Sequence, residues 1–454
     1  MASGAKPKAD RGYSTSQLVL ASLAFGSCMV FWAIYNSYVP LMLDYELSHL
    51  ENVALSATVV STLTGFIMTF DNFFGLIFQP IFGRKSDHMR SRFGKRMPYL
   101  IVGVPVCAVL FVLMPLAMRL GGMAGIVSMM AIIIAFNFVM STWRAPCVAI
   151  MPDMVPVEYQ SDGNAVVNMI AAVSQIIATL SATILTLMGF GEALDSGDYL
   201  SVFVFGAVVC LLFLVVLLTC VRWHDNRGEA VEAAEEATEH ESIRHLNIPR
   251  AAKVSMAFMM VSLFFISGSS DGFNTYFTLY ATKLLGISAT NATLVRTVAT
   301  LGGVLLAVPA GVIGRRFGRK RAISVGIVGV VCCHALMLAL PHVVGSGTGT
   351  MVPLAAINFA YAIFFILVNI NTLPIMLAIG GPERFGAFTG YYYMATFSAA
   401  VVCPTVIGFL IGVSGTYNAL QAFGLVTMVL ALLCLQRVRH GDVVEGEGAA
   451  AEEA

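Results

Sequence analysis

The sequence predicts an all-α polytopic membrane protein with 12 transmembrane helices arranged as two six-helix halves. Hydrophobic residues make up 58% of the 454 residues and charged residues only 11%, against about 25% charged residues in a typical soluble domain. Twelve apolar runs are long enough to cross a bilayer, which takes about 20 residues. Basic residues gather in alternate connections between these runs. Most of the surface must therefore face lipid.

Each expected helix is a long run of apolar residues bounded by polar or glycine-rich connections. Six runs precede the longest polar stretch inside the chain, and six follow it. The expected helices cover residues 17–39, 57–82, 98–118, 122–150, 164–189, 199–221, 253–280, 292–313, 322–341, 352–378, 386–412 and 417–436.

The polar stretches divide the chain into parts. Residues 1–221 form the N-terminal six-helix half, and residues 253–439 form the C-terminal half. Residues 222–252, rich in glutamate and alanine, predict an acidic cytoplasmic linker between the halves. Residues 440–454, rich in Glu, Gly and Ala, predict a disordered tail.

The basic residues predict the orientation. Of the 26 lysines and arginines, 22 fall in the N-terminal segment, the linker, the C-terminal segment and the even-numbered connections. The other side has only Arg119 and Lys283, while Arg144 and Arg296 fall inside spans. The positive-inside rule then places both termini in the cytoplasm. We expect a multi-pass protein of the plasma (cytoplasmic) membrane, functional as a monomer.

The charge balance, the cysteines and the absence of catalytic motifs argue against several classes of function. Net charge is zero, so nothing in the charge balance favours nucleic acid as a partner. All nine cysteines lie in apolar runs without a CxxC pair, which is typical of buried small hydrophobic residues. We expect no cofactor and no metal site. No span carries an HExxH or GxSxG-type motif, so an enzyme is the weakest interpretation.

Two connections share a sequence pattern. The first reads Arg92-Phe-Gly-Lys-Arg96 after the second helix, and the other reads Arg316-Phe-Gly-Arg-Lys after the eighth. The two Phe-Gly pairs lie 224 residues apart, near half of the 454-residue length. A single basic loop is weak evidence, but two at matched positions indicate a duplicated six-helix unit.

The repeated pattern resembles the signature loop of the major facilitator superfamily. The stretch from Gln79 to Pro98 is similar to the sucrose-transporter branch of the glycoside–pentoside–hexuronide:cation symporters, and Arg144-Ala-Pro-Cys147 with Met151-Pro-Asp153 resembles the fourth helix of that branch. The resemblance covers the whole chain in layout and implies sugar uptake coupled to a cation, often a proton. It also implies a cytoplasmic gate that locks the two halves by charge and helix-dipole contacts. The expected gate residues are Gly83, Asp87, Arg92, Gly94, Arg96, Asp153, Arg316, Gly318 and Arg319.

Four charged residues lie well inside the expected spans, namely Asp71, Arg144, Asp271 and Arg296. A charge at the bilayer centre costs about 2.5–3.5 kcal/mol on insertion scales, so such residues usually face a cavity or a partner. Asp71, with no evident base at its depth in the same half, is the expected proton site. Asp271 and Arg296 come from consecutive antiparallel helices and predict an ion pair that opens during the transport cycle, or a static pair between two helices. We expect these four residues to couple transport to a cation, either a proton or sodium, with the proton favoured.

A sugar site needs aromatic faces for stacking and amide or carboxylate groups for hydroxyls. In a duplicated carrier we expect this site near mid-membrane between the halves. Polar side chains at helical spacing mark the inner helices of such a fold. The expected substrate-binding residues are Trp32, Tyr35, Asn36, Asn137, Ser141, Asn274, Tyr361 and Asn369.

The sequence thus favours a secondary active transporter of a disaccharide or α-glucoside by alternating access. One alternative is an exporter of another metabolite or a drug on the same fold, for which a more apolar lining is expected. Another is a non-transporting membrane receptor, which would not need charged residues buried in both halves.

Overall fold

The computed structural model describes residues 14–50, 55–89, 91, 93–155, 160–221, 249–380 and 385–440. Nearly all of the predicted linker and tail lie outside these residues. The described part contains 12 helices long and apolar enough to cross a membrane. They coincide with the 12 runs expected from the sequence, which confirms the fold class. Helices suit these runs because an α-helix satisfies its backbone polar groups internally, as lipid requires.

The N-terminal half contains six spans, several of them built from more than one helix. They are α1 (Thr15–Ala21) with α2 (Leu23–Ser48), α3 (Ala57–Met68) with α4 (Phe70–Asp87), α5 (Met97–Met118), α6 (Gly122–Met154), α7 (Gln160–Leu185) and α9 (Leu200–Cys220). A π-helical turn (Thr186–Phe190) and the short α8 (Gly191–Asp195) follow α7.

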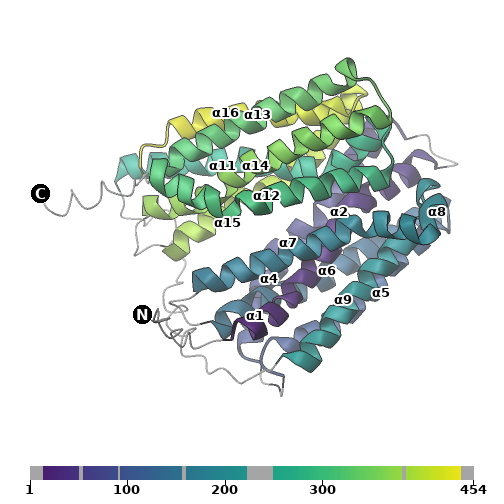
Figure 1. Cartoon of the computed structure of the whole chain (residues 1–454), viewed down its shortest axis with the longest axis horizontal. Helices are drawn as coiled ribbons and strands as arrows, with labels where there is room; N and C mark the ends of the chain where they lie inside the picture. Colours follow the sequence, from purple (N-terminus) through teal and green to yellow (C-terminus); the bar gives the residue numbers. More distant parts are fainter. Residues whose placement is uncertain are drawn as a thin grey trace, which may run out of the picture.

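The C-terminal half repeats this layout. Its spans are α11 (Arg250–Leu279) with the π-helical η4 (Tyr280–Leu284), α12 (Ala289–Phe317), α13 (Arg319–Val343), α14 (Met351–Gly380), α15 (Phe385–Ser414) and α16 (Asn418–Gln436). In Figure 1 the two halves form separate bundles, with the N-terminal half in purple to teal and the C-terminal half in green to yellow.

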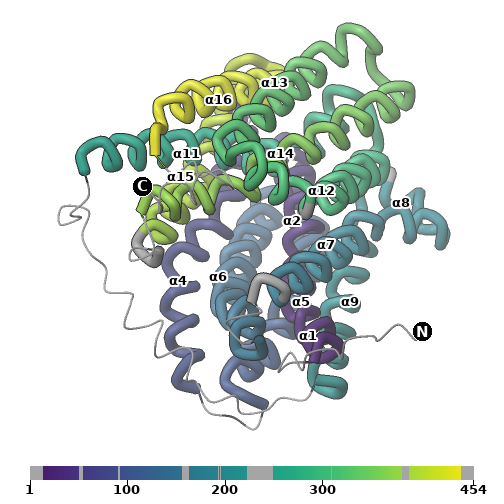
Figure 2. Tube along the Cα trace, turned by 60° about the vertical axis from the view of Figure 1, so that its left-hand side comes forward, coloured from purple at the N-terminus to yellow at the C-terminus, as the bar shows by residue number. Residues whose placement is uncertain are grey.

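The two ends of the bundle differ in charge. We call the end where α4 and α12 finish in arginine- and lysine-rich turns the basic end, and the opposite end, where α2 finishes and α12 begins, the far end. The bundles lie close together at the far end and diverge toward the basic end (Figure 1). α7 and α12 lie side by side in both views (Figure 2) and are among the pairs in contact between the halves, with α2–α11 and α3–α15.

Close packing between α3 and α15 depends on glycine. A Cβ at Gly65 would collide with the Pro404 carbonyl, one at Gly408 with the Ser61 carbonyl, and one at Gly412 with Thr58. Small residues let helix backbones approach closely inside membranes. The halves therefore meet backbone to backbone on the far half of the bundle.

Polar contacts join the halves in the same region. Tyr276 donates a hydrogen bond to the Ser61 carbonyl at 2.6 Å, and Thr297 donates to the Thr179 hydroxyl at 2.7 Å. At the far end itself, Asp44 accepts a hydrogen bond from Tyr417 at 3.0 Å and pairs with Lys283 at 3.1 Å. In this conformation the far end is closed.

The second span is interrupted, which the sequence did not predict. α3 ends at Met68 and α4 begins at Phe70, with Thr69 between them donating its hydroxyl to the Phe66 carbonyl at 2.7 Å. Asp71 consequently lies in the first turn of a new helix. Exposed N–H groups there favour a negative charge.

Candidate functional site

A small pocket lies in the N-terminal half, at the middle of the spans. Its volume is about 10 Å³, which is roughly the space of one water molecule. The lining comes from α2, α4 and α6 and consists of Trp32, Tyr35, Asp71, Gln79, Phe136, Asn137, Met140, Ser141 and Arg144. Six of these nine are predicted site residues, so the structure brings together all the predicted coupling and substrate residues of the N-terminal half except Asn36.

Asp71 is held by several donors in this pocket. The Trp32 indole donates to its Oδ2 at 3.2 Å, and the Asn72 backbone and side-chain amides donate to Oδ1 at 2.7 and 2.8 Å. Arg144 lines the same pocket and attracts the carboxylate electrostatically. The expectation that Asp71 has no base at its depth in the same half was therefore wrong. The packing of α4 against α6 brings Arg144 into the same pocket as Asp71.

Arg144 keeps its hydrogen-bonding capacity. Within the described part of the chain it donates no hydrogen bond and belongs to no ion pair. A guanidinium has five N–H donors in a rigid fork. A mid-span arginine needs a polar environment, and Arg144 has donors left over for one inside the pocket.

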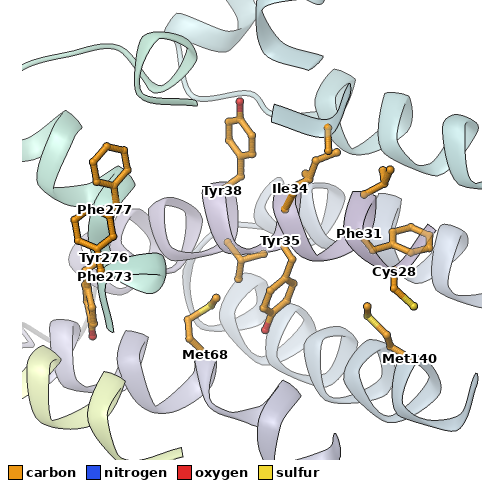
Figure 3. Close-up of a cluster of buried hydrophobic side chains, with 14 of the residues drawn as sticks. Cys28, Phe31, Ile34, Tyr35, Tyr38, Met68, Met140, Phe273, Tyr276 and Phe277 are labelled. Carbon is orange, nitrogen blue, oxygen red and sulfur yellow. The ribbon is translucent and has the colours of Figure 1, made fainter. Parts of the chain in front are cut away.

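Tyr35 and Asn137 form the rigid back of the pocket. Asn137 donates to the Tyr35 hydroxyl at 3.2 Å, and the Tyr35 ring stacks on Phe136 with centroids 5.8 Å apart. Figure 3 shows Tyr35 on the same side of its helix as Met140 and Met68, while Tyr38 points the other way. Both tyrosines are buried, which fixes their rotamers by packing.

Asp271 and Arg296 do not form the expected ion pair in this conformation. Arg296 instead donates to the carbonyl and side-chain oxygens of Asn274 at 3.1 and 3.2 Å, and lies 5.9 Å from the Phe277 ring centroid. Asp271 interacts electrostatically with Asp71 of the other half. The pair stays a prediction for another state of the cycle.

The other predicted substrate residues are not in the pocket. Asn36 donates to the Trp32 carbonyl of its own helix at 3.0 Å, and Asn274 is the acceptor of Arg296. Asn369 is exposed. Tyr361 is buried between Phe273 and Phe365, with centroids 4.7 and 5.8 Å away, and with its hydroxyl unpaired. Helical spacing alone could not tell which residue of a polar stripe faces a neighbouring helix.

A buried histidine was missed. His334 makes contacts of 2.8 Å to Gln421 and 3.3 Å to Ser269, and its ring meets that of Tyr361 edge-on at 5.4 Å. A lone histidine in an apolar run carries no distinctive spacing. The possible signal was that Gln421 and Ser269 are also polar residues inside spans.

The predicted gate residues of the N-terminal half converge on Arg96. Its guanidinium contacts Asp87 and the Ser86 hydroxyl, and its Nε donates to Asp153 at 2.9 Å. Lys95 also reaches Asp153, at 3.4 Å. We call Asp87, Lys95, Arg96 and Asp153 the Arg96 cluster; it ties the ends of α4, α5 and α6 together. Gly83 packs nearby against Ala145, and Arg92 lies outside the described residues.

The matching turn of the C-terminal half is built differently. Arg319 donates to the Pro374 carbonyl at 3.2 Å, and Lys320 donates to the Val438 and Gln436 carbonyls at 2.7 and 3.1 Å. Arg316 is exposed. Gly94 and Gly318 have φ angles of 82° and 95°, a region that other residues avoid. The backbone of the repeat is thus shared, but the partners of its bases are not.

In the residues that the structure describes, no group of three or more His, Cys, Asp or Glu side chains stands in position to hold a metal ion. The pocket and the Arg96 cluster remain the candidate functional sites.

Family comparison agrees with this architecture. The family model of the Major Facilitator Superfamily matches residues 20–373 and 259–452. The chain belongs to the major facilitator superfamily. The fold and family of this major facilitator protein are those of a membrane transporter.

Solved structures of this superfamily share the fold at low sequence identity. A xylose transporter from E. coli, in a partially occluded inward-open conformation, is 15% identical with a TM-score of 0.67, covering 94% of this chain and 99% of that one. A nucleoside transporter mutant is 13% identical with a TM-score of 0.65, and the match covers 92% of this chain and 98% of that one. A bacterial homolog of the human lysosomal transporter Spinster is 13% identical with a TM-score of 0.64, and the match covers 96% of this chain and 97% of that one. These similarities establish the fold alone.

A human protein described as a membrane-associated transporter protein is 31% identical over 87 residues. The match spans 19% of this chain and 14% of that protein. It is therefore a local similarity.

Proposed function

We propose that this major facilitator protein is a proton-coupled sugar symporter that works by alternating access. The observation that carries the proposal is the pocket shared by Trp32, Asp71 and Arg144. An indole face for stacking, a carboxylate and a guanidinium with free donors are the groups with which proteins bind sugars. The sucrose-type resemblance of the surrounding motifs and the fold shared with a xylose transporter support the same substrate class.

Proton coupling follows from the charges around the pocket. Asp71 and Asp271 come from opposite halves and interact electrostatically. In an alternating-access carrier the two halves move relative to each other. When their like charges approach, the repulsion favours binding of a cation such as a proton. Protonation of Asp71 would also remove its electrostatic attraction for Arg144, so that the free donors of the guanidinium can turn to substrate hydroxyls.

The small size of the pocket is compatible with a carrier whose substrate site opens and closes during the transport cycle. A pocket of about 10 Å³ is too small for a disaccharide, so the substrate would extend into the space between the halves. The closed far end, joined through Asp44, Lys283 and Tyr417, corresponds to the inward-open state, with the basic end cytoplasmic by the positive-inside rule.

The proposal is tested in proteoliposomes that hold a trapped pH dye. Addition of disaccharides outside is expected to acidify the interior, and Asp71→Asn is expected to abolish this sugar-driven change. Glu192→Gln, an exposed carboxylate on α8, is the matched control and should transport normally. Labelled sugar entry with unchanged pH dependence in Asp71→Asn would remove Asp71 from the coupling role, and no entry of any sugar would overturn the substrate class.

Alternating access is tested at the α3–α15 contact. Gly408→Leu is expected to hold the halves apart at the far end, because a side chain there meets the Ser61 carbonyl. Spin labels at the exposed positions Val127 and Val343, in a background with Cys220 and Cys332 replaced by serine, should report a longer distance. Gly390→Leu, on the same helix with open space around it, should leave the distance unchanged. Equal distances in both variants would contradict closure at this contact.

Transport of a nucleoside or a peptide is the second candidate function. The same fold is found in nucleoside and peptide transporters, and Arg144 could bind an anionic group as well as hydroxyls. Nucleosides and dipeptides therefore belong in the panel of test substrates.

A further inference from the structure

A second cavity, larger than the central pocket, lies at the far end. Its volume is about 470 Å³, within the range of sites that bind small organic molecules. The ends of α2, α5 and α8 and the start of α9 line it from one half, and Lys283 of η4 and Ala289 of α12 line it from the other. It therefore lies between the halves, apart from the residues of the proposed sugar site.

Both bases that line this cavity are paired, one of them with an acid outside the lining, Asp44. Arg119 pairs with Asp198 at 2.8 Å, and Lys283 pairs with Asp44 at 3.1 Å. Glu46 is the remaining charged residue of the lining. Only 7% of its surface is exposed. Among the described residues its carboxylate has no hydrogen bond or ion pair, and His49, three residues on, attracts it electrostatically.

A nearly buried carboxylate without a partner is costly. Glu46 lines the cavity, and its Oε2 lies next to α6, 3.3 Å from where a Cβ on Gly125 would stand. The lining also contains apolar side chains, including Leu41, Met42 and Met118, and the two tyrosines Tyr45 and Tyr199.

We infer that this far-end cavity is a binding site for a small organic cation, with Glu46 as the counter-charge. A bare metal ion would leave most of the volume empty and would find one free carboxylate, whereas hard cations take six or more oxygens. An ammonium group on an apolar body matches the carboxylate, the apolar walls and the tyrosine rings, which attract cations. Because both halves line the cavity, an occupant contacts both and stabilises the closed far end.

The test measures thermal unfolding of the purified full-length protein by intrinsic tryptophan fluorescence. Three probes of one shape separate charge from size, namely benzylammonium, benzyl alcohol and benzoate, at constant ionic strength. Benzylammonium is expected to raise the unfolding temperature saturably, as a ligand of the native state must, and the other two are not.

Glu46→Gln removes the charge and keeps the shape, and is expected to weaken benzylammonium binding about tenfold, as loss of one charge-assisted contact does. Glu192 is exposed and lies outside the lining, so the control variant Glu192→Gln should bind benzylammonium as tightly as the unmodified protein does. Ala289→Phe fills the cavity from the other half without touching Glu46, and should abolish binding even if Glu46→Gln fails to fold.

Equal shifts with benzyl alcohol, stronger binding of benzoate, or unchanged binding in Ala289→Phe would each overturn the assignment. The measurement needs no transport. A protein that moves no sugar but binds benzylammonium through Glu46 would therefore disprove the proposed function and leave this site standing.

Discussion

Arg96 and Lys320 occupy equivalent positions in the two halves, three residues after Phe93 and Phe317 of the repeated pattern, yet they bind different partners. Arg96 is buried and contacts the carboxylates of Asp87 and Asp153. Lys320 donates to backbone carbonyls where α16 ends. The repeat therefore preserves a base and a turn, while the groups facing that base have diverged.

This difference in partners predicts that the two bases contribute differently to the stability of the fold. Removing a buried base that faces two partly buried carboxylates deprives Asp87 of its ion pair and leaves Asp153 with Lys95. A base facing carbonyls at a helix C-terminus completes hydrogen bonds that water can also supply. The N-terminal turn is thus the more sensitive of the two, and the N-terminal half contains four of the six charged residues of the predicted gate.

The largest effect is expected from truncation of these two bases. Arg96→Ala should lower stability by about 3 kcal/mol, because Asp87 and Asp153 lose their main partner. Lys320→Ala should cost about 1 kcal/mol, because hydrogen bonds to the Gln436 and Val438 carbonyls are lost. The apparent unfolding temperature of each purified variant, followed by tryptophan fluorescence, checks the order. A loss for Lys320→Ala as large as for Arg96→Ala would contradict the comparison.

A smaller effect is expected when the charge is kept but the geometry changes. Arg96→Lys should recover only part of the stability, because an ammonium cannot contact Asp87, Ser86 and Asp153 with one rigid fork. The reverse exchange, Lys320→Arg, should be nearly neutral, since either side chain can donate to carbonyls. Unfolding temperatures again provide the measurement, and full recovery in Arg96→Lys would show that charge alone matters.

The smallest effect is expected at the two glycines, where the halves agree. Gly94→Ala and Gly318→Ala should each cost about 1 kcal/mol, because both positions have positive φ angles that favour glycine. Similar losses in unfolding temperature in the two variants would confirm that the turn itself is the conserved part of the repeat. A loss in only one of them would mean that side-chain packing, rather than backbone conformation, dominates there.

Long-range pairing accounts for what was wrong or missing in the sequence analysis. The apolar runs predicted the 12 spans because each needs only local composition. The break at Thr69 was missed, although Thr69, Asp71 and Asn72 are residues that favour helix starts, because the apolar run continues through it. Arg144 was recognised as a charge inside a span, but its approach to Asp71 depends on how α4 and α6 rotate against each other.

The sequence by itself determined the membrane class, the number of spans, the duplicated layout and the charged residues inside the spans. These properties follow from composition, length and spacing along one segment at a time. Only the tertiary structure decided that Arg296 donates to Asn274, that Asp71 shares a pocket with Trp32 and Arg144, and that Glu46 faces a cavity between the halves. Each of these contacts joins segments distant in sequence, and its energy depends on helix rotation and packing that no local pattern encodes.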